Sequence, residues 1–121
     1  MSGDTIFGKI IRGEIPSRKV YEDHEIIAFH DINPVAQVHF LIVPKKFIAT
    51  LADITAEDVP LLGRMLELAP KLAREHGLIE GFRTSINTGR IGGQEVYHLH
   101  IHIYGNLPGG ERLGPLAGHG I

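Results

Sequence analysis

Three histidines alternate with apolar residues near the end of the chain. His98, His100 and His102 are separated by Leu99 and Ile101. Successive side chains of a β-strand point to opposite faces, so one strand would place the three imidazoles on one face and the apolar residues on the other. Neighbouring imidazoles would start about 6–7 Å apart, close enough for all three to meet one phosphate-sized group. The pattern therefore predicts a histidine-lined site.

Three kinds of site fit this pattern. Histidines separated by one residue on a strand can bind zinc when a further ligand comes from elsewhere. A neutral imidazole can also attack phosphorus while its neighbours hold charge, because its reference pKa is about 6.5. The plain alternative is a set of partly buried histidines bonded to backbone carbonyls. The triplet alone slightly favours a metal site over the other two.

The glycine-containing loop before the triplet changes this order. The segment 87–95 contains Gly89, Gly92 and Gly93. Glycines allow backbone N–H groups to converge into an anion-binding nest, although such loops are more often ordinary hairpin connections. Followed by three imidazoles, the loop indicates a phosphate held between amides and histidines. A metal would not require the nest.

The elements that must position these residues follow from the apolar pattern. A short helix capped by Asp4 is expected before Gly13. A long helix should begin at a capping pattern formed by Thr55 and Asp58, and Pro70 should kink it or be absorbed by a local bulge. The predicted helices are 5–12 and 55–76, and the predicted strands are 19–22, 26–30, 38–43, 82–87 and 96–104. The fold class is α+β, a five-stranded, mostly antiparallel sheet with two helices packed on one face.

Composition limits the functional classes. The chain has 121 residues, 12 Lys plus Arg against 14 Asp plus Glu, and no Cys. Disulfides, thiolate metal sites and a Cys nucleophile are excluded. The sequence has no stripe of basic residues of the kind that nucleic-acid-binding proteins usually carry. No apolar window approaches the roughly 20 residues that are needed to cross a bilayer. We expect one domain over 1–121 with a C-terminal tail over about 106–121, no secretory signal at Met1–Asp4, and a cytoplasmic location.

Several segments together resemble the histidine triad (HIT) family. Residues 92–102, GGQEVYHLHIH, are similar to its His-x-His-x-His signature. Residues 4–11, 29–34 and 39–46 resemble its nucleotide-binding (Hint) branch, and Glu95 with residues 113–119 is most like the bacterial members. The resemblance covers nearly the whole chain and implies the HIT-like fold.

The resemblance also implies an activity. Members of this branch are homodimeric purine nucleoside phosphoramidases that cleave a P–N bond in nucleoside phosphoramidates and related acyl-nucleotidates without a metal or other cofactor. His100 would be the nucleophile, His98 and His102 would surround the phosphate, and His39 would complete a proton relay. The alternatives are a dinucleoside polyphosphate hydrolase, a non-catalytic nucleotide-binding regulatory protein and a metal-binding protein.

The nucleotide contacts are implied in the same way. Asp31 would hold the ribose hydroxyls, although before Asn33-Pro34 it is also a plausible turn former. The base pocket and its surroundings would be formed by Ile6, Phe7, Ile10, Phe29, His30 and Ile32. The phosphate or adjoining sugar would meet Asn87, Gly93, Gln94, Glu95 and the amide of Val96. Glu95 stands where animal members have Ser, and Phe47 stands where they have His, so Phe47 should have no catalytic part. His119 is a further candidate from the tail.

Overall fold

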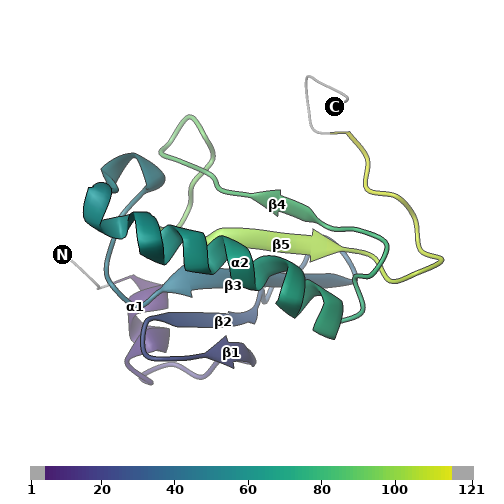
Figure 1. The fold of residues 1–121 in the computed structure, drawn as a ribbon, viewed down its shortest axis with the longest axis horizontal. Coiled ribbons are helices and arrows are strands. Elements are labelled where there is room, and N and C mark those ends of the chain that lie inside the picture. Colours follow the sequence, from purple (N-terminus) through teal and green to yellow (C-terminus); the bar gives the residue numbers. More distant parts are fainter. Residues whose placement is uncertain (1–4, 116–121) are drawn as a thin grey trace.

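The computed structural model describes residues 5–115 and contains one sheet with helices on both sides (Figure 1). The helices are α1 (Ile6–Ile11) and α2 (Val59–Glu75), and two short 3₁₀ turns, Leu51–Asp53 and Ala56–Asp58, precede α2. The strands are β1 (Lys19–Glu22), β2 (Ile26–His30), β3 (Val38–Pro44), β4 (Arg83–Ser85) and β5 (Ile101–Gly105). Among the described residues, no helix is both long and apolar enough to span a membrane.

The sheet confirms the predicted fold class. Its strand order is β1-β2-β3-β5-β4, and every neighbouring pair is antiparallel. β5 lies between β3 and the edge strand β4, so His102 of β5 lies on the strand next to His39 of β3. In this register His102 is paired with Leu41 and His39 with Tyr104.

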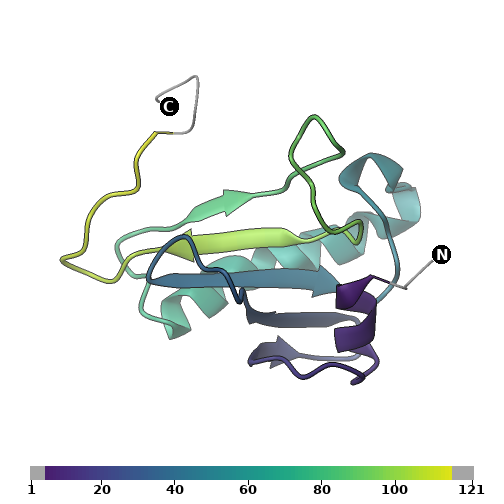
Figure 2. The ribbon, with the colours of Figure 1, turned by 180° about the vertical axis from the view of Figure 1, so that it is seen from behind.

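The prediction that both helices cover one face is wrong. The helix α2 packs its Met65, Ala69 and Leu72 against one face of the sheet, with Phe40 and Ile101 in the same cluster. The helix α1 covers the opposite face, where Phe7 joins a second cluster that includes Phe29 and Leu41 (Figure 2). The central strands are buried on both faces, since β2 and β3 carry almost continuous apolar side chains.

The ends of the helices follow local chemistry. The α1 helix is capped by Thr5, whose Oγ1 accepts a hydrogen bond from the Gly8 amide at 3.1 Å; Asp4, the predicted cap, lies outside the described residues. The Thr55–Asp58 capping box forms as predicted, but around a 3₁₀ turn one step before α2. Pro70 lies inside α2, and the helix continues as one element to Glu75.

The strand that carries the histidine triplet begins later than predicted. β5 starts at Ile101, whereas residues 96–98 form a bend. The Leu99 amide donates to the carbonyl of Ile48, at 2.7 Å, in the segment that follows β3. The chain before Ile101 is therefore tied to a loop and not to the strand ladder. The side-chain alternation survives, because Leu99, Ile101 and Ile103 are all buried.

Candidate active site

A cavity of about 530 Å³ opens on the face of the sheet that α1 covers. Its walls come from α1, the segment that follows it, the end of β2, the loop before β5 and β5 itself. Thirteen of the sequence-predicted residues line it: Ile6, Phe7, Ile10, Phe29, His30, Asp31, Ile32, Asn87, Gly93, Glu95, Val96, His100 and His102. Segments far apart in the sequence thus meet at one concave site.

The cavity also includes residues that sequence reasoning missed, and it leaves three predicted ones out. The missed residues are Ile15, Pro16, Ser17, Arg18, Asn33 and Leu41. Leu41 could have been found from the alternation of β3, which places it on the same face as His39; the turn at Ile15-Pro16 carried no functional signal. The predicted residues that do not line the cavity are His39, Gln94 and His98.

His100 is held in a tautomer that leaves one nitrogen free for chemistry. Its Nδ1 lies 2.7 Å from the carbonyl oxygen of His98. A carbonyl only accepts, so Nδ1 carries the proton and Nε2 keeps its lone pair. The ring is buried, with Phe7 edge-on at 4.9 Å between centroids and His102 at 4.9 Å. Burial lowers the pKa of His100, which keeps the imidazole neutral near pH 7.

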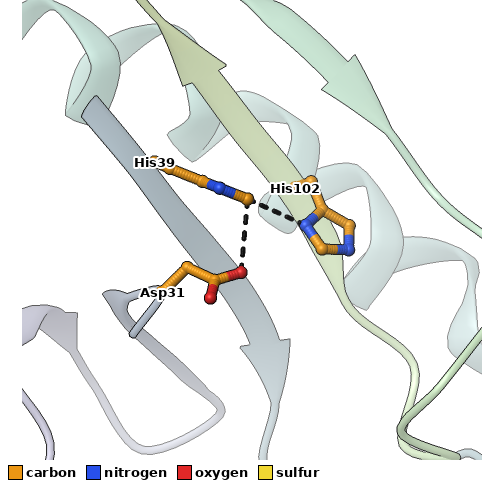
Figure 3. Close-up of side chains that lie close together, drawn as sticks. All are labelled: Asp31, His39 and His102. Atoms are coloured by element: carbon orange, nitrogen blue, oxygen red, sulfur yellow. Dashed lines mark hydrogen bonds and ion pairs between the residues drawn. The ribbon is translucent and has the colours of Figure 1, made fainter. Parts of the chain in front are cut away.

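A chain of hydrogen bonds leads from His102 to the backbone. The Val35 amide donates to His39 Nδ1 at 3.2 Å, so neutral His39 carries its proton on Nε2. That nitrogen lies 3.0 Å from His102 Nδ1 and 3.4 Å from an oxygen of Asp31 (Figure 3). His102 Nδ1 therefore accepts, and His102 carries its own proton on Nε2. The chain fixes the tautomers of both rings.

Asp31 combines a structural role with its place on the cavity. Its Oδ1 accepts a hydrogen bond from the Asn33 amide at 2.8 Å, which makes the turn that the sequence allowed. Its other oxygen faces His39. The carboxylate therefore lies at the junction of the cavity and the histidine pair.

The same trio is the one candidate metal cluster among residues 5–115. The ligand atoms of Asp31, His39 and His102 lie within 4.8 Å of one another. A metal on His39 Nε2 would require the ring proton on Nδ1, where it would oppose the Val35 N–H that now donates to that nitrogen. The donor arrangement therefore favours a hydrogen-bonded pair over a metal site.

The imidazoles of His39 and His102 stay neutral at pH values below the usual pKa of histidine. Burial, assisted by the neighbouring rings of His100 and His39, lowers the pKa of His102 to about 4. Burial also lowers the pKa of His39, although Asp31 opposes the shift. At neutral pH the rings in the site are therefore uncharged. They can donate hydrogen bonds, accept hydrogen bonds or act as a nucleophile.

These shifts predict a pH dependence of stability. The unfolded chain takes up protons on these histidines once the pH falls below about 6.5, whereas folded His102 resists until about 4. The stability that neutral histidines provide above pH 6.5 should therefore be lost as the pH falls towards 4. Thermal unfolding from pH 8 to pH 4 checks this, and His102→Asn, which keeps an acceptor for His39, should flatten the slope. An equal slope in both proteins would contradict it.

His98 differs from the other two histidines because it does not line the cavity, and its contact with phosphate stays a prediction. It is 1% exposed, and its Nε2–H donates to the Pro44 carbonyl at 2.7 Å. Phe7 and Phe47 pack against its ring, at 6.4 Å and 5.6 Å between centroids. Because the segment before Ile101 bends away from the ladder, His98 lies behind the cavity and does not line it. Its carbonyl, which orients His100, is its direct link to the site.

The loop before β5 is closed by its own hydrogen bonds. The amides of Gly93 and Gln94 donate to Arg90 and Gly89, and Gln94 is buried with its side chain bonded to Gly89, Ala49 and Val96. The predicted nest is therefore wrong for these two amides, which the turn already uses. Within the described part of the chain, the amides of Glu95 and Val96 donate to no protein acceptor, and both residues line the cavity.

The charges around the cavity are unbalanced. Two carboxylates, Asp31 and Glu95, line it, and Arg18 is the one Lys or Arg among the described lining residues. The charge of Arg18 acts on His30, whose pKa is lowered first by burial and then by this guanidinium. No cation from residues 5–115 stands beside His100 and His102 on the cavity wall.

Comparisons with known proteins agree with this arrangement. A family model described as "Scavenger mRNA decapping enzyme C-term binding" matches residues 4–112. A purine nucleoside phosphoramidase of Escherichia coli is 49% identical over 120 residues, with 98% of each chain covered. A HIT-like protein of Synechococcus elongatus is 57% identical over 105 residues, which cover 87% of this chain and 92% of that one.

Solved structures give the same result. A HIT family hydrolase from Legionella pneumophila superposes with a TM-score of 0.82 at 47% identity, covering 89% of this chain and 95% of that one. A histidine triad protein from Clostridium difficile gives a TM-score of 0.80 at 48% identity, with 89% and 96% covered. The fold, the histidine-lined cavity and these relatives together show that this chain is a hydrolase of the histidine triad family.

Proposed function

We propose that the protein hydrolyses the P–N bond of purine nucleoside 5′-phosphoramidates and related acyl-nucleotidates, with His100 as the nucleophile. The observation that carries the proposal is the His100 tautomer. Its Nδ1–H is fixed on the His98 carbonyl, so the ring offers the Nε2 lone pair at the cavity. The relative named purine nucleoside phosphoramidase supports the same substrate class.

The chemistry divides into two displacements. In the first, His100 Nε2 bonds to phosphorus and the P–N bond breaks; its electron pair goes to nitrogen, which takes a proton and leaves as an amine. In the second, water bonds to phosphorus, the bond to Nε2 breaks and its pair returns to the ring. The proton that water releases replaces the one taken by the amine. The His39–His102 hydrogen bond offers a path for that proton.

The cavity supplies the remaining contacts. Phosphate oxygens would meet the free amides of Glu95 and Val96 and the Nε2–H of His102, which are donors placed before the reaction begins. Asp31 would accept from the ribose hydroxyls, a pairing that suits a carboxylate. Ile6, Phe7 and Ile10 give an apolar surface for a purine.

The charges on the cavity wall favour this function over polyphosphate hydrolysis. A bound dinucleoside polyphosphate would bring several negative charges to a wall that has two carboxylates and one arginine. Phosphate chains are usually held by Lys or Arg. The phosphoramidate carries a single negative charge at phosphorus and needs no such clamp.

A comparison of substrates tests the proposal. Purified protein is given adenosine 5′-phosphoramidate and diadenosine tetraphosphate at equal concentration, and release of the monophosphate is followed by chromatography. We expect kcat/KM to be at least about 100-fold higher for the phosphoramidate. A faster reaction of the tetraphosphate would support the polyphosphate alternative. Tight nucleotide binding without turnover of either compound would support the non-catalytic one.

We also propose that the protein is a homodimer. β4 is an edge strand of three polar residues, Arg83–Ser85, and the backbone groups on its outer side are not paired with another described strand. A second copy could extend the sheet across a two-fold axis. Sedimentation equilibrium showing a stable species of monomer mass would contradict this. The predicted cytoplasmic location stays a prediction.

A further inference from the structure

We infer that Glu95 makes the site select leaving amines that carry a second, positive charge. The inference rests on the proposed function and names the class of substrate within it: nucleoside phosphoramidates of diamines and similar cationic amines. Glu95 lines the cavity and belongs to the segment that leads directly to His100.

The carboxylate of Glu95 has no partner among the residues that the structure describes. Within residues 5–115 it forms neither an ion pair nor a side-chain hydrogen bond, although most other acidic groups near strands are paired, such as Glu22 with Lys19 and Lys45. Glu95 is exposed at the mouth of the cavity. Its charge is therefore available to a ligand.

The other charges at this end do not cancel that of Glu95. The rings of His100 and His102 are neutral near pH 7, and Asp31 adds a second negative charge. Arg18 belongs to the segment after α1, where its carbonyl accepts from the His30 amide at the end of β2. The cation of the cavity is thus on the β1–β2 side, while Glu95 comes from the loop before β5.

An uncompensated carboxylate beside a phosphoryl group has two consequences. It attracts a positive charge on the departing amine, since opposite charges a few ångströms apart interact appreciably at a partly exposed site. It also repels the dianionic monophosphate product more than the monoanionic phosphoramidate. The same group therefore favours cationic substrates and helps the product to leave.

Three substrates that differ only in the charge of the leaving amine test the inference. These are the adenosine 5′-phosphoramidates of 1,3-diaminopropane, propylamine and β-alanine, with cationic, neutral and anionic tails. The wild type, Glu95→Gln and the matched control Glu67→Gln are compared by kcat/KM at low and high salt. Glu67 is exposed on α2, so its substitution makes the same charge change away from the cavity.

We expect the wild type and Glu67→Gln to prefer the cationic over the anionic compound by about tenfold at low salt, and this preference to shrink at high salt. Glu95→Gln should lose most of this preference, measured as the ratio of kcat/KM for the cationic and the anionic compound within that variant. An unchanged preference in Glu95→Gln, or equal rates on all three compounds in the wild type, would overturn the inference. Failure of the wild type to hydrolyse any of the three would instead overturn the proposed function.

Discussion

Replacing His100 with Ala should lower phosphoramidate turnover by at least about 10⁴-fold, because it removes the group that bonds to phosphorus. Nucleotide affinity should change little, since the apolar wall and Asp31 remain. The ring is buried against Phe7, so the variant should also be somewhat less stable. Steady-state kinetics and titration with adenosine monophosphate, below the unfolding temperature, measure the two effects separately.

The control for this variant is His24→Ala. His24 is an exposed histidine that does not line the cavity, so its loss removes an imidazole without touching the site. Its turnover should equal that of the wild type. If His100→Ala retained more than about a tenth of the wild-type rate, His100 would not be the nucleophile.

Replacing His98 with Ala should act mainly on stability. The substitution leaves a cavity between Phe7 and Phe47 and removes the donor to the buried Pro44 carbonyl. Loss of a buried ring with its hydrogen bond costs about 2–4 kcal/mol in the free energy of unfolding. The His98 carbonyl remains to accept from His100, so turnover of the folded fraction should fall far less than in His100→Ala.

Urea unfolding with kinetics on the folded protein checks this division. Phe47→Leu is the companion variant, because it loosens the packing around His98 while leaving the bond to Pro44. It should destabilise the protein less than His98→Ala. A His98→Ala protein of wild-type stability with strongly reduced turnover would place His98 among the phosphate contacts, as the sequence alone suggested.

The sequence predicted well what depends on local periodicity. Runs of apolar and β-branched residues located the strands, and glycine located the ends of both helices, for example at Gly77, where φ is 87°. Most of the predicted site residues also line the cavity. They could be predicted because the resemblance to the family links positions that are far apart along the chain.

The errors arose where non-local contacts decide. The side of the sheet covered by α1 depends on how Phe7 packs against Phe29, 5.4 Å away, which no window of sequence contains. The bend before β5 depends on the bond from Leu99 to Ile48. His98 lies before β5 and does not line the cavity, although the three histidines alternate regularly with apolar residues.

The loop before β5 shows a further limit of prediction from the sequence. Glycine content indicated a loop whose amides could converge, and Gly89 and Gly93 have φ of 70° and 81°. It could not indicate which amides the turn itself uses. Gln94, predicted as a ligand contact, instead holds the loop to Ala49 and Val96.

Rapid acid-free quenching during turnover, followed by proteolysis and mass spectrometry, tests the nucleophile most directly. Adenosine 5′-phosphoramidate should leave the mass of one adenylyl group on the peptide that contains His100, and fragmentation should assign it to that residue. The adduct should form and decay at rates that match turnover. An adduct on another residue would contradict His100 as the nucleophile, and full turnover with no adduct at any time point would contradict the two-step mechanism.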